Sequence, residues 1–459
     1  MLTYTLKKEK GRSLYDALYH KIRADITGGL LPAGARLPSK RALAGNLGVS
    51  VATVESAYAQ LLAEGYIASR ERSGHFVCAI GERKRPAPPI APQESRGSAP
   101  ALLDLSGGGE DVPFPFSVWA KTMRSVLSEQ THELLRPVEL CGVPTLRQAI
   151  AQHLYQSRAM QVAPEQILIG AGNEYLYGLI VQLLGRDIRY GVEDPGYRKI
   201  SGIYAANDVA ICHIPMDSDG LCVDDLRQSG AQIAHISPAH HYPTGNVMPI
   251  RRRNELLHWA HEAQGRYILE DDYDSELRHS GKPVPPLFSL DMGQRVIYLS
   301  TFSQTIAPSL RIAYLCLPRD LMRRMQEKLG FYACTVPSFE QYTLARFISG
   351  GAYEKHVNRL RKRYRDRRAE IFAVLEASPL RGKYSIREEN AGTHFLLLLR
   401  TEKTDAALKK AAAQRGLAVK FLSDYRADGQ DSGGCMILNY ACLPKEQATR
   451  AMELLAQIL

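Results

Sequence analysis

The sequence has no uninterrupted apolar run that approaches the roughly 18 residues needed to span a lipid bilayer. Its N-terminal stretch, 1–12, is rich in lysine, but no apolar segment follows it, so the features of a secretory signal are missing. These two absences argue against a membrane partner, and we expect a cytoplasmic protein.

The sequence also has little that would hold a metal ion. Its eight cysteines are scattered and no two of them form a CxxC pair, which argues against a zinc site or a redox dithiol. His240 and His241 are adjacent and lie beside a Pro-Thr-Gly turn, but no carboxylate or thiol sits at a supporting spacing. We therefore predict no metal site and interpret the cysteines as reduced, mostly buried thiols.

The composition is that of an ordinary globular protein with an uneven charge. The 459 residues suffice for two or three domains, and 45% of them are hydrophobic while 23% are charged. The net charge is +10, and residues 1–80 carry 11 basic and six acidic side chains, a net charge of +5. A basic N-terminal part favours a polyanionic partner.

The pattern of this N-terminal part predicts a winged helix. Apolar residues at helical spacing over 13–26 predict a first helix, and serines cap two further helices over 40–47 and 50–64. Two short strands, 66–68 and 75–77, follow, joined by a basic turn. A helix, a helix-turn-helix and a two-stranded wing are the elements of a winged helix in their usual order.

The same segment closely resembles the GntR family of DNA-binding domains. The resemblance rests on Gly-Ala-Arg-Leu-Pro-Ser-Lys-Arg at 34–41, Leu-Gly-Val-Ser at 47–50, Thr-Val at 53–54 and Leu-Ala-Glu-Gly-Tyr at 62–66. It implies binding to double-stranded operator DNA. A helix-turn-helix used for protein contacts is the alternative, and the basic wing weighs against it.

Groove geometry assigns candidate DNA contacts. The N-terminal end of the helix that begins at Ser50 should point at base edges in the major groove. The preceding helix should hold phosphates with its N-terminus and basic side chains, and the wing should contact the backbone or the minor groove. The candidate DNA-binding residues are Arg36, Ser39, Lys40, Ser50, Val51, Thr53, Arg70, Arg72 and Gly74.

A segment rich in proline, serine and charge separates this domain from the rest of the chain. It covers 79–100 and predicts an extended tether, because its composition cannot bury a core. We therefore divide the chain into a DNA-binding domain (1–78), a linker (79–100) and a large body (101–459), whose smaller part begins near 350.

The body alternates short apolar strands with helices, which indicates an α/β fold with a mostly parallel sheet. The predicted strands are 167–169, 189–192, 210–214, 233–236, 267–269, 296–299 and 312–317. The predicted helices are 175–184, 251–264, 320–329, 338–349 and 353–375. A smaller α+β portion follows, with strands near 394–399, 418–421 and 436–440.

The motifs of the body resemble those of class I aminotransferases, the fold type I enzymes that use pyridoxal phosphate (PLP). They lie, in order, at 141–147, 170–174, 193–197, 237–245, 270–276 and 298–315. A GntR winged helix tethered to such a body is the layout of the MocR/GabR family of bacterial transcription regulators. That family resemblance implies a homodimer with its pocket at a two-fold interface.

The aminotransferase resemblance implies a ligand pocket. Backbone amides at a helix N-terminus, a serine and an arginine would hold a phosphate. One tyrosine would lie beside the ligand ring, an aspartate would face the pyridine nitrogen, and a second tyrosine would bind the ring hydroxyl. The corresponding residues are Gly172, Asn173, Ser303 and Arg311 for the phosphate, Tyr197, Asp271 and Tyr273 for the ring, and Gln304 at the cofactor-lysine position. Local pairing of Asp271 and a structural ion pair of Arg311 are the alternatives.

The chain departs from the aminotransferase pattern at three places. Gln304 stands where the family has the lysine that forms a Schiff base, and a carboxamide nitrogen cannot form one. Ile437 stands where the family has the arginine that clamps the substrate carboxylate. Asn173 and Glu174 replace the usual Ser-Gln, and Glu174 would add negative charge near a phosphate.

These observations favour a transcription regulator with a catalytically silent body and no catalytic residues. The body would sense an unidentified small effector without covalent chemistry, and PLP or a related ligand could bind there non-covalently. Two alternatives remain: a working PLP-dependent aminotransferase with an accessory DNA-binding domain, and a dimerisation scaffold without a ligand.

Overall fold

The computed structural model describes residues 4, 6, 13–71, 73–80, 103–107, 113–278, 284–291, 294–387, 392–441 and 443–459. The chain divides into two compact units, Met1–Ser98 and Ala99–Leu459. Most of the linker proposed at 79–100 lies outside the described residues. No helix among the described residues is both long and apolar enough to cross a membrane.

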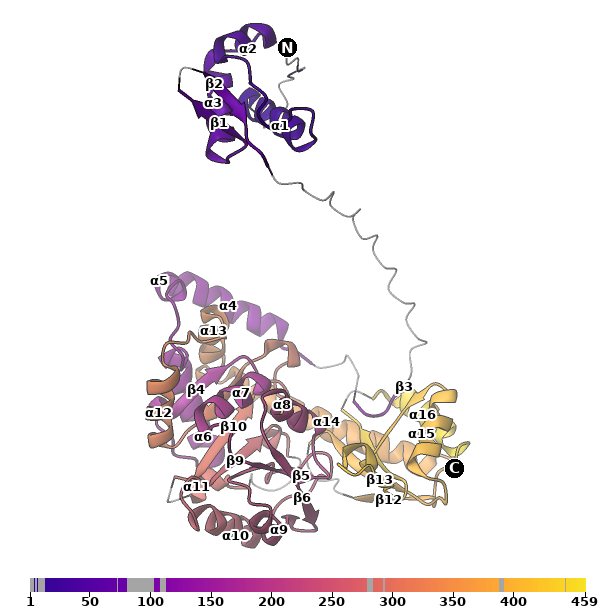
Figure 1. The fold of residues 1–459 in the computed structure, drawn as a ribbon. Helices are drawn as coiled ribbons and strands as arrows, with labels where there is room; N and C mark the ends of the chain where they lie inside the picture. The colour runs from indigo at the N-terminus through magenta and orange to yellow at the C-terminus, as the bar shows by residue number, and fades with distance from the viewer. Residues whose placement is uncertain are drawn as a thin grey trace. The chain divides into compact units, whose positions relative to one another are not determined.

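The first unit is the winged helix that the sequence predicts (Figure 1). Its elements are α1 (Leu14–Thr27), α2 (Lys40–Leu47), α3 (Val51–Ala63), β1 (Ile67–Arg70) and β2 (Gly74–Val77). The strands pair antiparallel, with Ile67 opposite Val77. The hydroxyl oxygens of Ser39 and Ser50 accept hydrogen bonds from backbone N–H groups of α2 and α3, which fixes where both helices begin.

The apolar faces of the three helices form one small core. Leu18 and Ile22 of α1 are completely buried against Val54, Tyr58 and Leu61 of α3. The Tyr58 hydroxyl donates a hydrogen bond of 3.0 Å to the Pro38 carbonyl, which joins α3 to the turn before α2. The helical periodicity read from the sequence therefore marks the side chains that hold this unit together.

An eight-stranded sheet forms the centre of the second unit, in the order β4-β11-β10-β9-β8-β5-β6-β7. Five neighbouring strands, from β10 to β6, are parallel, while β11 and the edge strand β7 run antiparallel to their neighbours. The bounds are β4 (Ile167–Gly170), β5 (Tyr190–Asp194), β6 (Ile211–Asp217), β7 (Gly220–Leu221), β8 (Ile233–Ile236), β9 (Tyr267–Asp272), β10 (Val296–Thr301) and β11 (Ala313–Cys316). All seven predicted strands are present, and the mostly parallel sheet is confirmed.

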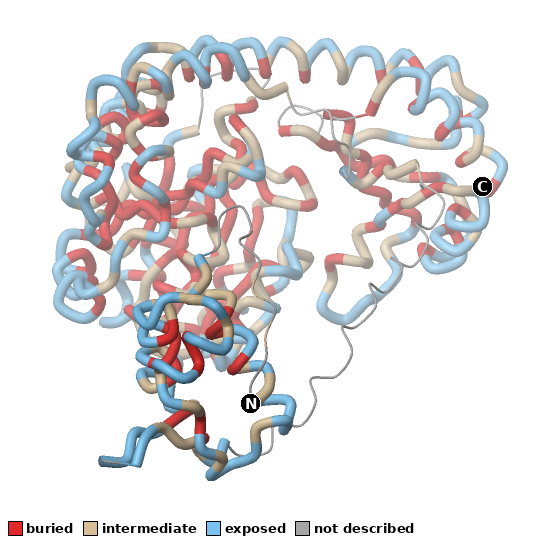
Figure 2. Tube along the Cα trace, turned by 90° about the horizontal axis from the view of Figure 1, so that it is seen from above, coloured by how far each residue is buried: buried red, intermediate tan, exposed pale blue. Residues whose placement is uncertain are grey.

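Helices cover both faces of this sheet and leave its strands buried (Figure 2). Side chains of α7, α8 and α12 pack on one face, and those of α6, α10 and α13 pack on the other. The bounds are α4 (Phe116–Glu129), α5 (Thr131–Leu134), α6 (Pro144–Arg158), α7 (Asn173–Leu184), α8 (Arg198–Ala206), α9 (Val223–Gln228), α10 (Ile250–His261), α11 (Leu287–Leu290), α12 (Arg319–Leu329) and α13 (Ser338–Ser349). Burial on both faces explains why the strands read as continuous apolar runs.

The smaller part of the body has its own core around a four-stranded sheet, β12-β13-β16-β15. The long helix α14 (Ala352–Ala377) leads into it, and β3 (Leu103–Asp104) pairs with β14 (Leu417–Ala418). Its other elements are β12 (Tyr384–Arg387), β13 (His394–Leu399), α15 (Asp405–Gln414), β15 (Lys420–Phe421), β16 (Cys435–Asn439) and α16 (Lys445–Ala456). The single strand expected near 418–421 is instead two short strands in different sheets, because each half pairs with a different partner.

A buried ion pair joins α6 to the end of β9. The guanidinium of Arg158 lies 2.8 Å from the carboxylate of Asp272, and both side chains are almost inaccessible. Arg158→Ala would leave this carboxylate buried without its cation, so we expect the unfolding free energy of the body to fall by about 3–5 kcal/mol. Chemical denaturation measures the change, and Arg323→Ala, which removes an exposed pair with Asp320, should alter stability little. Equal effects of the two substitutions would contradict this expectation.

Candidate functional site

The exposed start of α3 carries three of the candidate DNA-binding residues. Val51 is 42% exposed, although it is apolar. The hydroxyl of Ser50 accepts a hydrogen bond from the backbone of Thr53 and lies 2.8 Å from the Thr53 hydroxyl. The two polar side chains therefore hold the first turn together, and Val51 is left free for an outside contact.

The other candidates of this unit surround that turn. Lys40 of α2 pairs with Glu55 of α3 at 2.5 Å, so its ammonium already has a carboxylate partner. A side chain at Gly74, whose φ is +105°, would contact the guanidinium of Arg36. The Arg70 guanidinium lies over the Phe76 ring, 4.7 Å from its centroid. The Lys40 ion pair joins α2 to α3, and the Arg70 contact lies within the wing. Arg72 lies outside the described residues.

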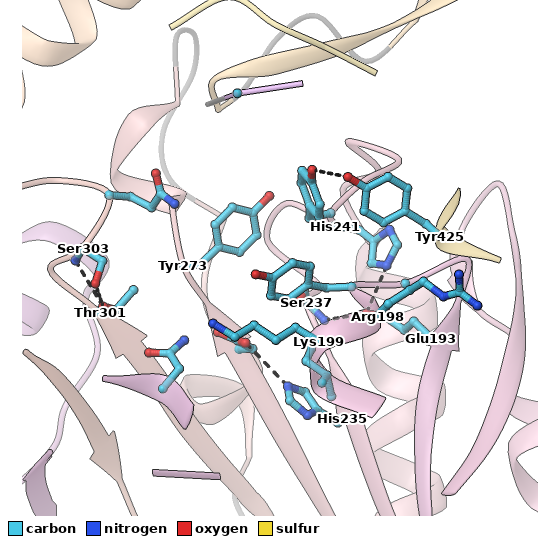
Figure 3. A pocket seen from close by; sticks show the side chains of 18 of the residues that line it. Glu193, Arg198, Lys199, His235, Ser237, His241, Tyr273, Thr301, Ser303 and Tyr425 are labelled. Carbon is cyan, nitrogen blue, oxygen red and sulfur yellow. Dashed lines mark hydrogen bonds and ion pairs between the residues drawn. The ribbon is translucent and has the colours of Figure 1, made fainter. Parts of the chain in front are cut away.

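The body contains a pocket of about 680 Å³ at the carboxyl ends of the parallel strands. Its walls come from the loops after β5, β8, β9 and β10, from α7 and α8, and from the smaller part of the body (Figure 3). Seven of the eight predicted pocket residues line it: Asn173, Tyr197, Asp271, Tyr273, Ser303, Gln304 and Arg311. Gly172, the eighth, adjoins the pocket through Arg311, because a side chain at this position would collide with the Arg311 guanidinium.

The end of the pocket predicted to hold a phosphate is a cluster of three charges. Arg311, in a left-handed conformation with φ +52°, extends its guanidinium past Gly172 to the carboxylate of Glu174. The ammonium of Lys199 binds the other oxygen of the same carboxylate. The structural ion pair considered for Arg311 as an alternative is therefore present. Its partner is Glu174, the residue that the sequence indicated would disfavour a phosphate.

A second polar part of the pocket is built around Asp271, the next-to-last residue of β9. Its Oδ2 accepts a short hydrogen bond from the Tyr177 hydroxyl and lies 3.5 Å from His235 Nε2. Its Oδ1 is buried and has no hydrogen-bond partner among the residues that the structure describes. The Tyr273 hydroxyl lies 3.2 Å from His240 Nδ1, and burial raises the pKa of Tyr273 well above its usual value. The pocket therefore presents a carboxylate acceptor and a protonated phenol to a ligand.

The loop after β10 places Ser303 and Gln304 at the pocket. The hydroxyl of Thr301 lies 2.9 Å from that of Ser303 and accepts the Ser303 backbone N–H, which fixes the start of the loop. Gln304 is exposed toward the pocket and offers a carboxamide there. Ile437 of β16 does not line the pocket; it is completely buried in an apolar cluster that includes Tyr425.

Several pocket residues were missed by sequence reasoning. Tyr242 and Tyr425 join their hydroxyls at 2.7 Å across 183 residues of chain, and the Tyr197 ring meets the edge of Tyr242. Asn439 lines the pocket two residues beyond Ile437 on β16. Lys199 and its neighbour Arg198, both on α8, also line the pocket (Figure 3). Of these residues, only Arg198 and Lys199 had a signal in the sequence, because they directly follow the predicted pocket residue Tyr197.

One wall of the pocket is a buried acid beside a histidine. Glu193 Oε2 accepts the backbone N–H of Ser237 at 2.9 Å and lies 3.4 Å from His241 Nε2. Burial raises the pKa of Glu193 to about 8, and burial together with the nearby His240 lowers the pKa of His241 to about 3. Both side chains are therefore neutral near pH 7, and this wall adds no charge to the pocket.

The raised pKa of Glu193 makes stability depend on pH. Between the ordinary value of 4.5 and about 8, the folded protein holds a proton that the unfolded chain releases, so stability falls as pH rises through this window. Glu193→Gln cannot ionise, and we expect its melting temperature to fall less than that of the wild type from about pH 5 to 8. Glu262→Gln, which removes a carboxyl with a lowered pKa, is the control. Parallel curves for wild type and Glu193→Gln would contradict the assignment.

Comparisons with known proteins agree with both the winged helix and the α/β body described above. Residues 14–77 match the family model of bacterial regulatory proteins of the gntR family, and residues 104–455 match that of aminotransferase class I and II. A multiple substrate aminotransferase from Thermococcus profundus superposes with a TM-score of 0.70 at 26% identity, covering 79% of this chain and 92% of that structure.

Full-length relatives are named as regulators. The HTH-type transcriptional regulator YdeL of Bacillus subtilis is 39% identical over 410 residues, 88% of each chain. The pyridoxine biosynthesis transcriptional regulator PdxR of Corynebacterium glutamicum is 34% identical, covering 94% of this chain and 93% of its own. The probable rhizopine catabolism regulatory protein MocR of Rhizobium meliloti is 32% identical, covering 91% and 88%.

A gntR-type winged helix followed by an aminotransferase-type body defines a DNA-binding transcriptional regulator. The chain belongs to the MocR/GabR family of these regulators.

Proposed function

We propose that the body of this regulator senses a small effector that binds non-covalently in the pocket and thereby controls DNA binding. The observation that carries the proposal is Gln304, a carboxamide on the pocket loop after β10. The sequence resemblance assigns this position to the cofactor lysine of aminotransferases. A carboxamide nitrogen is not a nucleophile, so it cannot attach an aldehyde cofactor. We accordingly assign no catalytic residue to this body.

Lys199, the lysine among the described pocket residues, does not take the place of the missing cofactor lysine. Lys199 binds Glu174, and this hydrogen bond raises the pKa of the Lys199 ammonium above its usual value. An ammonium has no free electron pair with which to attack a carbonyl. The departure at Ile437 supports the same conclusion, since this buried side chain offers no donor to a substrate carboxylate.

PLP is the first ligand to test. The buried Oδ1 of Asp271, which has no hydrogen-bond partner in the described part of the chain, would face a protonated pyridine nitrogen. Tyr273 would bind the ring hydroxyl, and Tyr197 would lie beside the ring. In enzymes, PLP attached to a lysine serves as an electron sink for reactions at an amino acid. Here we infer a ligand role only, and the relative PdxR, named for pyridoxine biosynthesis, supports PLP or a related compound as the candidate.

The family resemblance also suggests a role for each of the three parts of the chain. Residues 1–78 would bind operator DNA through the nine residues identified from the sequence, 79–100 would act as a tether, and 101–459 would bind the effector and dimerise. Two copies would place two winged helices on paired half-sites. Because its partner is operator DNA, we place the protein in the bacterial cytoplasm. A ligand would regulate only if it binds one arrangement of the dimer better than another.

Selection of DNA from a random-sequence pool tests the proposal. The full-length protein should enrich a duplex with two related half-sites, and PLP or another small metabolite should change its affinity for that duplex. Recovery of unselected sequence only would contradict the DNA-binding role. If a duplex is enriched but no ligand in a metabolite screen changes the affinity for it, the body would be a dimerisation scaffold without a ligand.

A further inference from the structure

Two cations on separate elements share one carboxylate at the phosphate end of the pocket. Lys199 lies on α8, Arg311 follows the 3₁₀ turn Pro308–Leu310, and Glu174 lies in the first turn of α7. One oxygen of Glu174 binds the ammonium and the other binds the guanidinium. All three side chains line the pocket.

The geometry of this cluster is built into the backbone. Gly172 has φ +91°, and any side chain there would collide with the Arg311 guanidinium. Arg311 itself adopts the left-handed conformation that residues other than glycine rarely take. Both features bring the guanidinium to the N-terminus of α7, where backbone N–H groups also favour an anion. The carboxylate of Glu174 is the anion that this arrangement now holds.

We infer that Arg311 and Lys199 form a clamp for the anionic group of a phosphate-bearing ligand, and that Glu174 is a built-in competitor for this clamp. The inference rests on the proposed function, since it concerns the ligand of the same pocket. A phosphate would bind both cations only in exchange for the Glu174 carboxylate. Glu174 thus sets how strongly the pocket prefers phosphate-bearing ligands over their unphosphorylated forms.

The exposure of the three side chains makes this exchange feasible. Lys199 is 52% exposed, Arg311 47% and Glu174 32%, so solvent screens both ion pairs and can solvate the released carboxylate. Although partial burial opposes it, hydrogen bonds from Lys199 and Arg311 lower the pKa of Glu174 to about 2. Glu174 therefore stays ionised at neutral pH and competes with an incoming anion throughout that range.

The test uses Glu174→Gln in the full-length protein, with PLP, pyridoxal and inorganic phosphate as probes. The glutamine keeps the shape of the side chain and removes its charge. Releasing two partly exposed ion pairs should tighten binding of PLP and of phosphate about ten-fold. Binding of pyridoxal, which lacks the phosphate, should not change. Adding Lys199→Gln to Glu174→Gln should reverse the gain, and melting temperatures verify that each variant is folded.

Glu262 provides a matched control. It bridges Arg227 and Arg266 at 2.9 Å each, as Glu174 bridges its two cations, but it does not line the pocket. Glu262→Gln should bind all three probes as the wild type does. Equal PLP affinity of Glu174→Gln and wild type, or no binding of phosphate probes to either, would overturn the inference.

The same experiment separates this inference from the proposed function. If Glu174→Gln binds PLP more tightly but no ligand changes DNA affinity, the clamp stands and the sensor role fails. If a ligand changes DNA affinity but Glu174→Gln does not alter the preference for phosphate, the sensor role stands and the clamp fails.

Discussion

Replacing Val51 by glutamate is expected to abolish most sequence-preferring DNA binding and leave the fold intact. Val51 is an exposed apolar residue in the first turn of α3, where we expect contact with base edges. A carboxylate there would be repelled by the duplex and would lose the apolar contact. Loss of a base contact costs about 1–3 kcal/mol, so with repulsion added we expect affinity to fall about 100-fold.

The design separates binding from stability. A negative charge in the first turn of a helix is favourable to the helix, so the melting temperature should not decrease. Leu30→Glu makes the same change at a 78% exposed position outside α3 and the wing, and should retain near-normal affinity. The measurement is fluorescence anisotropy with the duplex selected by the wild type. Equal affinity of Val51→Glu and wild type would show that α3 does not read the DNA.

Gln304→Lys is expected to create a covalent PLP site, which we propose the wild type lacks. Gln304 is exposed on the pocket loop and lines the pocket together with Ser303 and Arg311. If this is the cofactor-lysine position, a lysine there should attach the PLP aldehyde and give a visible absorbance band. Treatment with borohydride should then fix the ligand to residue 304, as peptide mass analysis would show.

Two control variants test whether attachment of PLP depends on a lysine at position 304. Gln304→Met has a side chain of similar length without an amine and should show no band. Ser309→Lys adds a lysine at an exposed position of the same loop that does not line the pocket, and should not be modified at that residue. Saturating PLP with no attachment to residue 304 would mean that Gln304 does not lie beside the ligand aldehyde.

The sequence predicted the scaffold well because its signals are local. Serine caps placed the starts of α2 and α3 correctly, and the apolar runs between turns marked each of the seven predicted strands of the large sheet. The short edge strand β7 escaped notice because two residues carry no periodic pattern. The stretch near 418–421 was misassigned because its two halves pair with strands distant in sequence.

The pocket was only partly predictable for a physical reason. Its predicted residues lie in motifs at strand ends, and seven of them do line the cavity. Tyr425 comes from the smaller part of the body, and its contact with Tyr242 depends on the packing of two subdomains. The sequence indicated that Glu174 would disfavour a phosphate, but not that Lys199 would complete an ion cluster with it. Such contacts arise from folding, not from spacing along the chain.

We propose that this regulator binds its effector without attaching it covalently. The most direct measurement is a titration of the purified full-length protein with PLP, following both heat and visible absorbance, with borohydride treatment at the end point. We predict heat of binding, no band from a Schiff base and no PLP fixed to a pocket residue. A band with PLP fixed to Lys199, the lysine on the described pocket wall, would contradict it.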